Sequence, residues 1–133
     1  MSKSILKLAQ KSAIVQRGIL EELEALAKSF DRSEKMIVEL KHDMEAVNAK
    51  HQNRETTRDD IAYLEDLLRC AKKKLVWEKQ MEKLSERTPE IMKRVSEMIN
   101  DQTMPPSDET RATVLGSLQS VQSAMERLER AKT

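Results

Sequence analysis

The sequence predicts an all-α protein, built as a long antiparallel helical hairpin (a coiled coil) with a shorter third helix packed at one end. Apolar residues recur in alternating steps of three and four along most of the chain, a spacing typical of helices that pack along one narrow face. Good helix formers dominate the composition, and only two Gly and three Pro interrupt them. Although 35% of the residues are charged, the apolar residues are periodic, which argues against intrinsic disorder.

The first predicted helix, about residues 3–52, carries the clearest apolar seam. This seam is broken only by Ser33, and it is too narrow to bury the helix from several sides, so it predicts a partner helix. The wider apolar face at 14–20 predicts two neighbouring helices at that end of the chain and one neighbour further along. The seam consists of Ile19, Leu23, Leu26, Phe30, Ser33, Ile37, Leu40, Met44 and Val47.

The second predicted helix spans about residues 57–99, after a reversal near 52–57. Thr56 or Thr57 is suited to cap it, because two Asp residues follow in the first turn. A frayed but continuous helix is the alternative to a reversal, since neither Gly nor Pro forces a turn there. Thr88 followed by Pro89 resembles a new helix start, which predicts a kink or break near 88–89.

The third predicted helix, about residues 108–131, follows a loop at 100–107 that contains two consecutive prolines. Ser107 is suited to cap this helix. At 1.5 Å per residue the three helices would be about 75, 60 and 35 Å long, so the third can cover only one end of the hairpin. We therefore expect one helical module over 1–133, with the third helix at the end marked by 14–20.

The second helix carries more apolar surface than the other helices can bury. A second apolar stripe runs beside its seam from 61 to 76, towards the end of the hairpin that the third helix does not reach. This mismatch predicts a partner-binding surface. The expected interface residues are Ile61, Leu64, Leu68, Leu75 and Val76 of the second helix, with Ile37, Leu40 and Met44 of the first.

No pattern in the sequence indicates catalysis or metal binding. His42 and His51 are half a turn out of phase on a helix, so they cannot share a metal ion, and we expect both to be solvated. Cys70 lies on the seam and is expected to be a buried, unreactive thiol. Because phosphate loops, nucleophile elbows and shielded carboxylate pairs are missing from the sequence, we expect no enzymatic activity, no cofactor and no small-molecule substrate.

Charge and hydropathy limit the kinds of partner. The net charge is +1, so no global basic field favours nucleic acid, and we expect no nucleic-acid partner. The stretch 69–83 holds six basic and two acidic residues, and a solvated helix face is the simplest explanation of it. An acidic partner or a lipid surface is the alternative. No apolar run is long enough for direct membrane insertion, and a single cysteine favours a reducing compartment. The expected location is therefore cytoplasmic, with the nucleus as the alternative.

Two stretches, residues 26–37 (LAKSFDRSEKMI) and 115–126 (LGSLQSVQSAME), carry a similarity to a known family. They resemble parts of the N-terminal coiled-coil region of the 70-kDa subunit of the exocyst, the vesicle-tethering complex. The first is similar to that family's L-x-K-S-x-x-x-[ST]-x-x-M-V segment, with Ile37 in place of Val, and the second to a short helix after a proline-containing loop. Residues 58–68 (RDDIAYLEDLL) are similar, in a looser way, to the family's intervening N-[IV]-x-x-x-L helix. The spacing between the stretches differs from the family's. The resemblance implies pairing with other subunits through long helices.

The sequence as a whole predicts a non-enzymatic helical interaction module that assembles into a larger coiled-coil complex, of which a vesicle tether is one example. Its expected partners are other helical subunits or a second copy of itself. Two alternatives remain open. One is a self-sufficient homodimeric spacer of the cytoskeletal or centromeric kind. The other is a three-helix co-chaperone module that binds a folded ATPase domain through charged helix faces.

Overall fold

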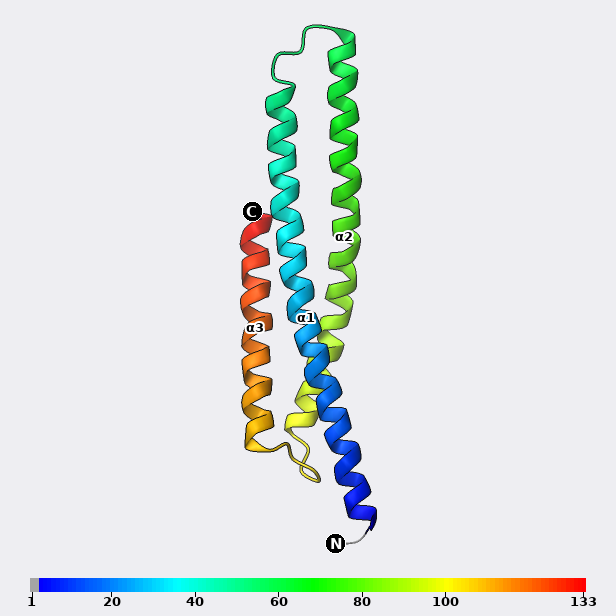
Figure 1. Ribbon diagram of the computed structural model, residues 1–133, viewed down its shortest axis with the longest axis vertical. Helices are drawn as coiled ribbons and strands as arrows, with labels where there is room; N and C mark the ends of the chain where they lie inside the picture. Colours follow the sequence, from blue (N-terminus) through cyan, green and yellow to red (C-terminus); the bar gives the residue numbers. More distant parts are fainter. Residues whose placement is uncertain (1–2) are drawn as a thin grey trace.

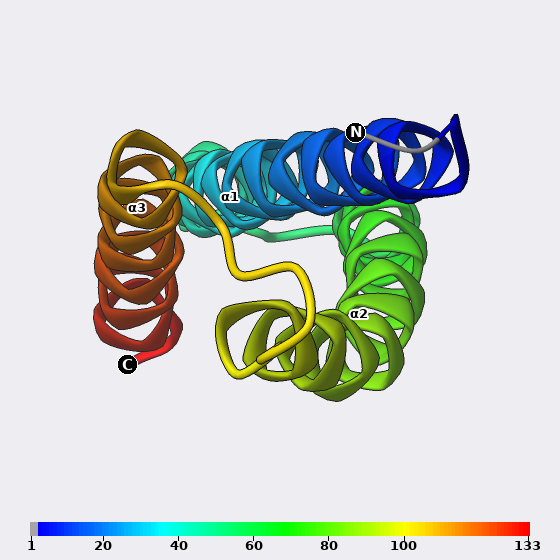
Figure 2. The same ribbon diagram turned by 90° about the horizontal axis from the view of Figure 1, so that it is seen from below.

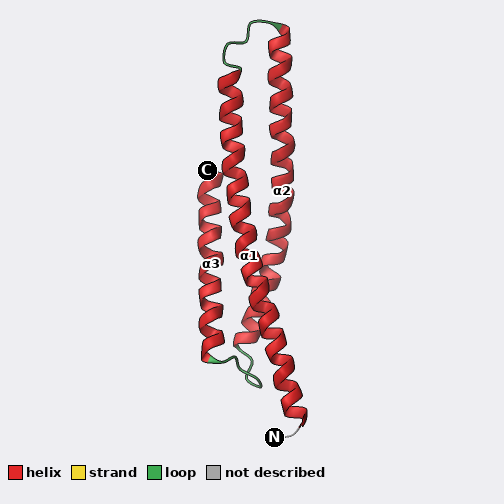
Figure 3. Cartoon of the chain, viewed as in Figure 1, coloured by secondary structure: helices red, strands yellow, loops and turns green. Residues whose placement is uncertain are grey.

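The computed structural model describes residues 3–133, and they form three α-helices and no strand (Figure 3). The helices are α1 (Lys3–Lys50), α2 (Thr57–Ile99) and α3 (Asp108–Lys132). The predicted all-α class is therefore confirmed. No described helix is long and apolar enough to cross a membrane.

The helix α1 lies at the centre of the arrangement. Its backbone lies close to both α2 and α3, and buried side chains of all three helices form one cluster. The helix α2 runs antiparallel to α1 along most of its length, and α3 runs beside the middle of α1, with the chain's C-terminus partway up the hairpin (Figure 1). The N-terminal part of α1 extends past the loop that joins α2 to α3 (Figure 1).

Local side-chain chemistry explains where the helices begin. The Thr56 hydroxyl accepts a hydrogen bond from the Asp59 amide, and the Asp59 carboxylate accepts one from the Thr56 amide, which together form a capping box. Ser107 caps α3 by accepting a hydrogen bond from the Thr110 amide. Of the two residues predicted to cap α2, Thr56 is therefore the one that does so. The chain reverses between α1 and α2, as predicted.

The helix α2 is continuous through Pro89 and does not restart there. The Thr88 hydroxyl donates a hydrogen bond to the Leu84 carbonyl one turn earlier, at 2.6 Å, so Thr88 does not act as an N-cap. Because proline lacks an N–H, it leaves the carbonyl one turn back without its helical partner, which favours bending. The C-terminal part of α2 curves away from the direction of its beginning (Figure 2).

The apolar core follows the seam of α1 where α3 accompanies it. Leu23 and Leu26 are fully buried, and the small Ser33 is 2% exposed. The indole N–H of Trp77 donates a hydrogen bond to the Ser33 carbonyl at 2.9 Å, which ties α2 to the polar position in the seam. The buried apolar cluster comprises Ile19, Leu23, Leu26, Phe30, Ile37, Trp77, Leu84, Ile91, Val95, Met98, Val114, Val121, Ala124 and Leu128.

The wide apolar face near the start of α1 is only partly covered. Leu20 packs against the core, but Ile14 is 67% and Val15 is 59% exposed. The expectation that the third helix packs at the end marked by 14–20 is therefore wrong for Ile14 and Val15, which it leaves exposed. The reason is the position of α3, which runs from the lower part of the core towards Lys41 and away from the start of α1 (Figure 1).

Candidate protein-interaction surface

The outward face of α2 carries an uncovered apolar stripe. Leu68 and Trp77 are nine residues apart, which places them on opposite sides of a helix. Since Trp77 points into the core, Leu68 and its neighbours one and two turns away point outwards. We call this set the outer stripe: Ile61 (52% exposed), Leu64 (62%), Leu68 (56%), Leu75 (53%) and the exposed Ala71 between them.

The outer stripe is exposed because α1 packs against the opposite side of α2 and α3 does not reach the outward side. The side that faces α1 carries Asp66, Cys70 and Trp77, which are all buried. The helix α3 lies along α1, on the side away from the upper part of α2, so it does not cover the outward face (Figure 1). A run of large apolar side chains at more than half exposure is unusual on a protein surface and is typical of interaction sites.

Val76 lies apart from the outer stripe, although the two were expected to form one surface. It is 52% exposed and lines a hollow of about 250 Å³ with Met36 and Leu40 of α1. On a helix, its direction differs by about 100° from that of Leu75, its sequence neighbour. It therefore belongs to the side of the hairpin where α1 and α2 meet.

The expected interface residues of α1 line a groove between α1 and α2. Ile37 is 7% exposed, Leu40 is partly buried and Met44 is 40% exposed. Together with Cys70, Trp77 and Met81 they surround an apolar groove of about 560 Å³. This groove lies just beyond the C-terminal end of α3, whose Lys132 forms part of its edge. The structure therefore separates the expected interface into two surfaces, the outer stripe and this groove.

Charged side chains surround the groove. Lys41, Lys74 and Lys132 lie at its edge with Glu78. The Lys41 ammonium donates a hydrogen bond to the Ala131 carbonyl near the end of α3. This contact holds the C-terminal end of α3 beside α1. The positive charge of Lys41 also interacts favourably with the dipole of α3, because it lies at the C-terminus of that helix.

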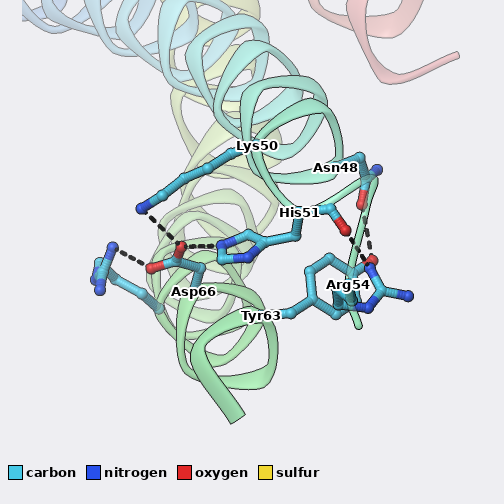
Figure 4. Close-up of polar contacts among 7 residues, drawn as sticks. Asn48, Lys50, His51, Arg54, Tyr63 and Asp66 are labelled. Atoms are coloured by element: carbon cyan, nitrogen blue, oxygen red, sulfur yellow. Dashed lines mark hydrogen bonds and ion pairs between the residues drawn. The ribbon is translucent and has the colours of Figure 1, made fainter. Parts of the chain in front are cut away.

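A polar cluster joins α1 and α2 at the end of the hairpin that lacks α3 (Figure 4). His51 and Asp66 lie 8% exposed each, and the imidazole Nε2 is 2.7 Å from the Asp66 carboxylate. The expectation of a solvated His51 is therefore wrong, whereas His42 is exposed and lies near Glu45. His51 follows Val47 by four residues on the seam of α1, a position that faces α2.

Several charges converge on the Asp66 carboxylate. Its pKa is lowered, mainly by the hydrogen bond from His51 and then by the nearby positive charges of Lys50 and Arg69, while partial burial opposes this effect. The Lys50 ammonium lies 3.5 Å away and the Arg69 guanidinium 2.9 Å away. Asp66 therefore stays ionised and serves as the acceptor at the centre of the cluster.

Tyr63 completes the polar cluster on its other side (Figure 4). Its hydroxyl donates a hydrogen bond to the Asn48 side chain at 2.8 Å, and the Arg54 guanidinium lies 4.0 Å from the ring centroid. The Arg54 guanidinium also donates a hydrogen bond to the His51 carbonyl. These contacts connect the turn to both helices, so the cluster is a structural fastening of the hairpin end.

The remaining chemical candidates are Cys70, groups of metal-ligating side chains and the basic stretch 69–83. Cys70 is a buried free thiol at the edge of the groove, as expected from its place on the seam. Among the described residues, His, Cys, Asp and Glu form no group of three or more that could hold a metal ion. Within the basic stretch 69–83, Arg69 and Lys73 are paired with Asp66 and Asp43, so part of its charge is already compensated.

Comparisons with protein-family models, curated proteins and solved structures find no match to this chain.

Proposed function

We propose that this chain is a non-enzymatic protein–protein interaction module. In this proposal the long antiparallel hairpin, with the shorter α3 at one end, presents helix faces to other helical subunits of a larger coiled-coil complex. The observation that carries the proposal is the outer stripe, whose four large side chains stay more than half exposed after α1 and α3 have packed. Burying such side chains fully contributes roughly 1.5–3 kcal/mol each, and about half of that remains available here.

The groove between α1 and α2 supports the same function with a second surface. Its α1 side is formed by Ile37, Leu40 and Met44 and its α2 side by Cys70 and Trp77. The α1 residues are separated by steps of three and four, and the two α2 residues by seven, so each set lies on one face of its helix. A helix bound in the groove, in line with α3, would contact apolar side chains of both α1 and α2. The outer stripe and the groove would allow two different helical neighbours.

The resemblance to the N-terminal coiled-coil region of the exocyst 70-kDa subunit favours a vesicle-tethering complex as the setting. A single cysteine, kept as a free buried thiol, favours a reducing compartment and therefore the cytoplasm.

The test is the double substitution of Leu64→Glu with Leu68→Glu in the full chain. Both side chains are exposed, so we expect unchanged far-UV circular dichroism but weaker self-association by light scattering and weaker cross-linking to helical partners. Leu115→Glu on α3, which is 58% exposed, is the matched control and should change neither. If the double variant self-associates and captures partners as the wild type does, the outer stripe is not the interaction surface.

A further inference from the structure

The spacing of the outer stripe matches a coiled-coil seam. Its five residues, which run from Ile61 to Leu75, are separated by steps of three, four, three and four, the a/d pattern of two heptads. Glu78 and Glu82 occupy the next two positions of this pattern, so the apolar seam ends there. A surface of this shape fits one helix of about the same length.

The charged residues beside the stripe indicate what that helix carries. Glu65 and Lys72 flank the stripe on the same side, one heptad apart, and both are exposed. A helix that pairs well must place a positive charge beside Glu65 and a negative charge beside Lys72. A second copy of α2 that runs antiparallel meets both requirements. Antiparallel pairing places the second copy's Lys72 beside Glu65 and the second copy's Glu65 beside Lys72.

We propose that the outer stripe binds the outer stripe of a second copy of this chain, with the two α2 helices antiparallel. This inference rests on the proposed function and names the partner of that surface. In the favoured register Leu64 lies opposite the partner's Leu75 and Leu68 opposite the partner's Ala71. Two-fold symmetry repeats each pair, so Glu65 and the partner's Lys72 form two equivalent ion pairs across the interface.

Other alignments of two copies place like charges together. In a parallel pair, Asp60 would lie beside the partner's Glu65, and Lys74 beside the partner's Lys79. In an antiparallel pair shifted by one heptad, Glu65 would face the partner's Glu65. Like charges placed directly across a helix interface weaken pairing. The charge pattern therefore selects one orientation and one register.

The molecule leaves room for this pairing. The helices α1 and α3 lie on the other side of α2, so a second copy can approach the outer stripe without meeting them (Figures 1 and 2). The helix α2 is already formed, so pairing does not have to order it. In this register Ile61 lies opposite the partner's Glu78, which limits the apolar contact to about two heptads. We therefore expect a weak, reversible dimer.

Sedimentation equilibrium of the full chain over a hundredfold concentration range tests the inference. We expect a monomer–dimer equilibrium for the wild type. Glu65→Lys alone and Lys72→Glu alone each convert both ion pairs into repulsions, so each should raise the dimer dissociation constant by roughly tenfold at low salt. The variant that carries both substitutions should recover the wild-type value within about twofold.

Mixing the two single variants tests the orientation directly. In an antiparallel pair between the two variants, the Lys introduced at position 65 faces the Glu introduced at position 72 of the other chain. The native Lys72 likewise faces the native Glu65 of the other chain. Both contacts are attractive, so we expect a heterodimer that is tighter than either homodimer. In a parallel pair the two positions do not face each other, and mixing should gain nothing. As controls, Glu24→Lys and Lys28→Glu reverse two exposed charges on α1 and should leave the wild-type equilibrium unchanged.

Two results would overturn the inference. One is a chain that stays monomeric over the whole range with unchanged helicity. The other is a dimer that neither single charge reversal weakens. The proposed function survives either result if Leu64→Glu with Leu68→Glu still reduces cross-linking to a different helical subunit. It fails as well if that double variant changes no association at all.

Discussion

Replacing Trp77 by Phe measures how much the contact between α2 and the polar position of the α1 seam contributes to stability. Trp77 is 7% exposed, and its indole N–H donates a hydrogen bond to the Ser33 carbonyl at 2.9 Å. Phe keeps an aromatic ring but has no N–H and is smaller. The substitution therefore removes one hydrogen bond and leaves a small cavity, while the fold keeps its other contacts.

The expected loss follows from these two effects. The side chain shrinks by roughly 40 Å³, which at about 24 cal/mol per Å³ of cavity corresponds to about 1 kcal/mol. The hydrogen bond contributes about 1 kcal/mol more. No larger penalty is expected, because Ser33 lies inside α1 and its carbonyl keeps the helical amide as a partner. We therefore expect Trp77→Phe to cost about 2 kcal/mol and Trp77→Ala about 3–5 kcal/mol.

Urea unfolding followed by far-UV circular dichroism measures both values. The protein concentration should be kept low, so that association does not add to the apparent stability. Tyr63→Phe is the matched control, because it removes a hydroxyl whose hydrogen bond to Asn48 is exposed, and it should cost well under 1 kcal/mol. A loss below about 0.5 kcal/mol for Trp77→Phe would refute the assigned role of the indole.

Two further predictions concern acid stability and the bend in α2. The pKa of Asp66 is lowered in the folded chain, mainly by His51, so its carboxylate stabilises the fold above about pH 4, and this contribution is lost as the pH falls through the lower folded-state pKa. Urea midpoints of wild type and Asp66→Asn should therefore differ at pH 7 and converge in acid; a pH-independent difference would contradict this. Pro89→Ala restores an N–H inside α2 and should stabilise the chain by about 1–3 kcal/mol in the same assay. A loss of stability would mean that the bend is needed for packing against α1.

The sequence predicts the helices well because their limits depend on neighbouring residues. Thr56 and Asp59 form the capping box of α2 within one turn, and Ser107 caps α3 directly after the prolines. The burial of the α1 seam from Ile19 to Ile37 follows equally from its spacing. The caps can be deduced from residues within one helical turn, and the seam from repeated steps of three and four residues along one helix.

Features that depend on how the helices meet are harder to predict. His51, directly after α1, and Asp66, in α2, are 15 residues apart, and their contact depends on the register between α1 and α2. The sequence indicates only that His51 continues the seam. Similarly, helix propensity favours a break at Pro89, but packing of the residues after it, such as Val95, keeps α2 continuous.

The expected interface illustrates the same limit. Leu40 and Leu68 are both apolar positions beside a helix seam, and the sequence alone does not show whether they face the same way. In the structure Leu40 lies at the groove between α1 and α2, whereas Leu68 points away from α1. The orientation of α2 about its own axis decides this, and Trp77 sets that orientation because it must reach Ser33.

The two halves of the hairpin are stabilised by different physical means, and this explains why the outer stripe lies where it does. Where α3 accompanies α1, fully buried side chains such as Leu26 and Leu128 form a three-helix core. Beyond the end of α3 the hairpin has only two helices, which bury little, and polar contacts such as that between His51 and Asp66 hold them together. Two helices fastened by polar contacts need no apolar residues on their outward faces. The apolar side chains on the outward face of α2 therefore have no role in the packing of this chain, and this favours a role in binding another helix.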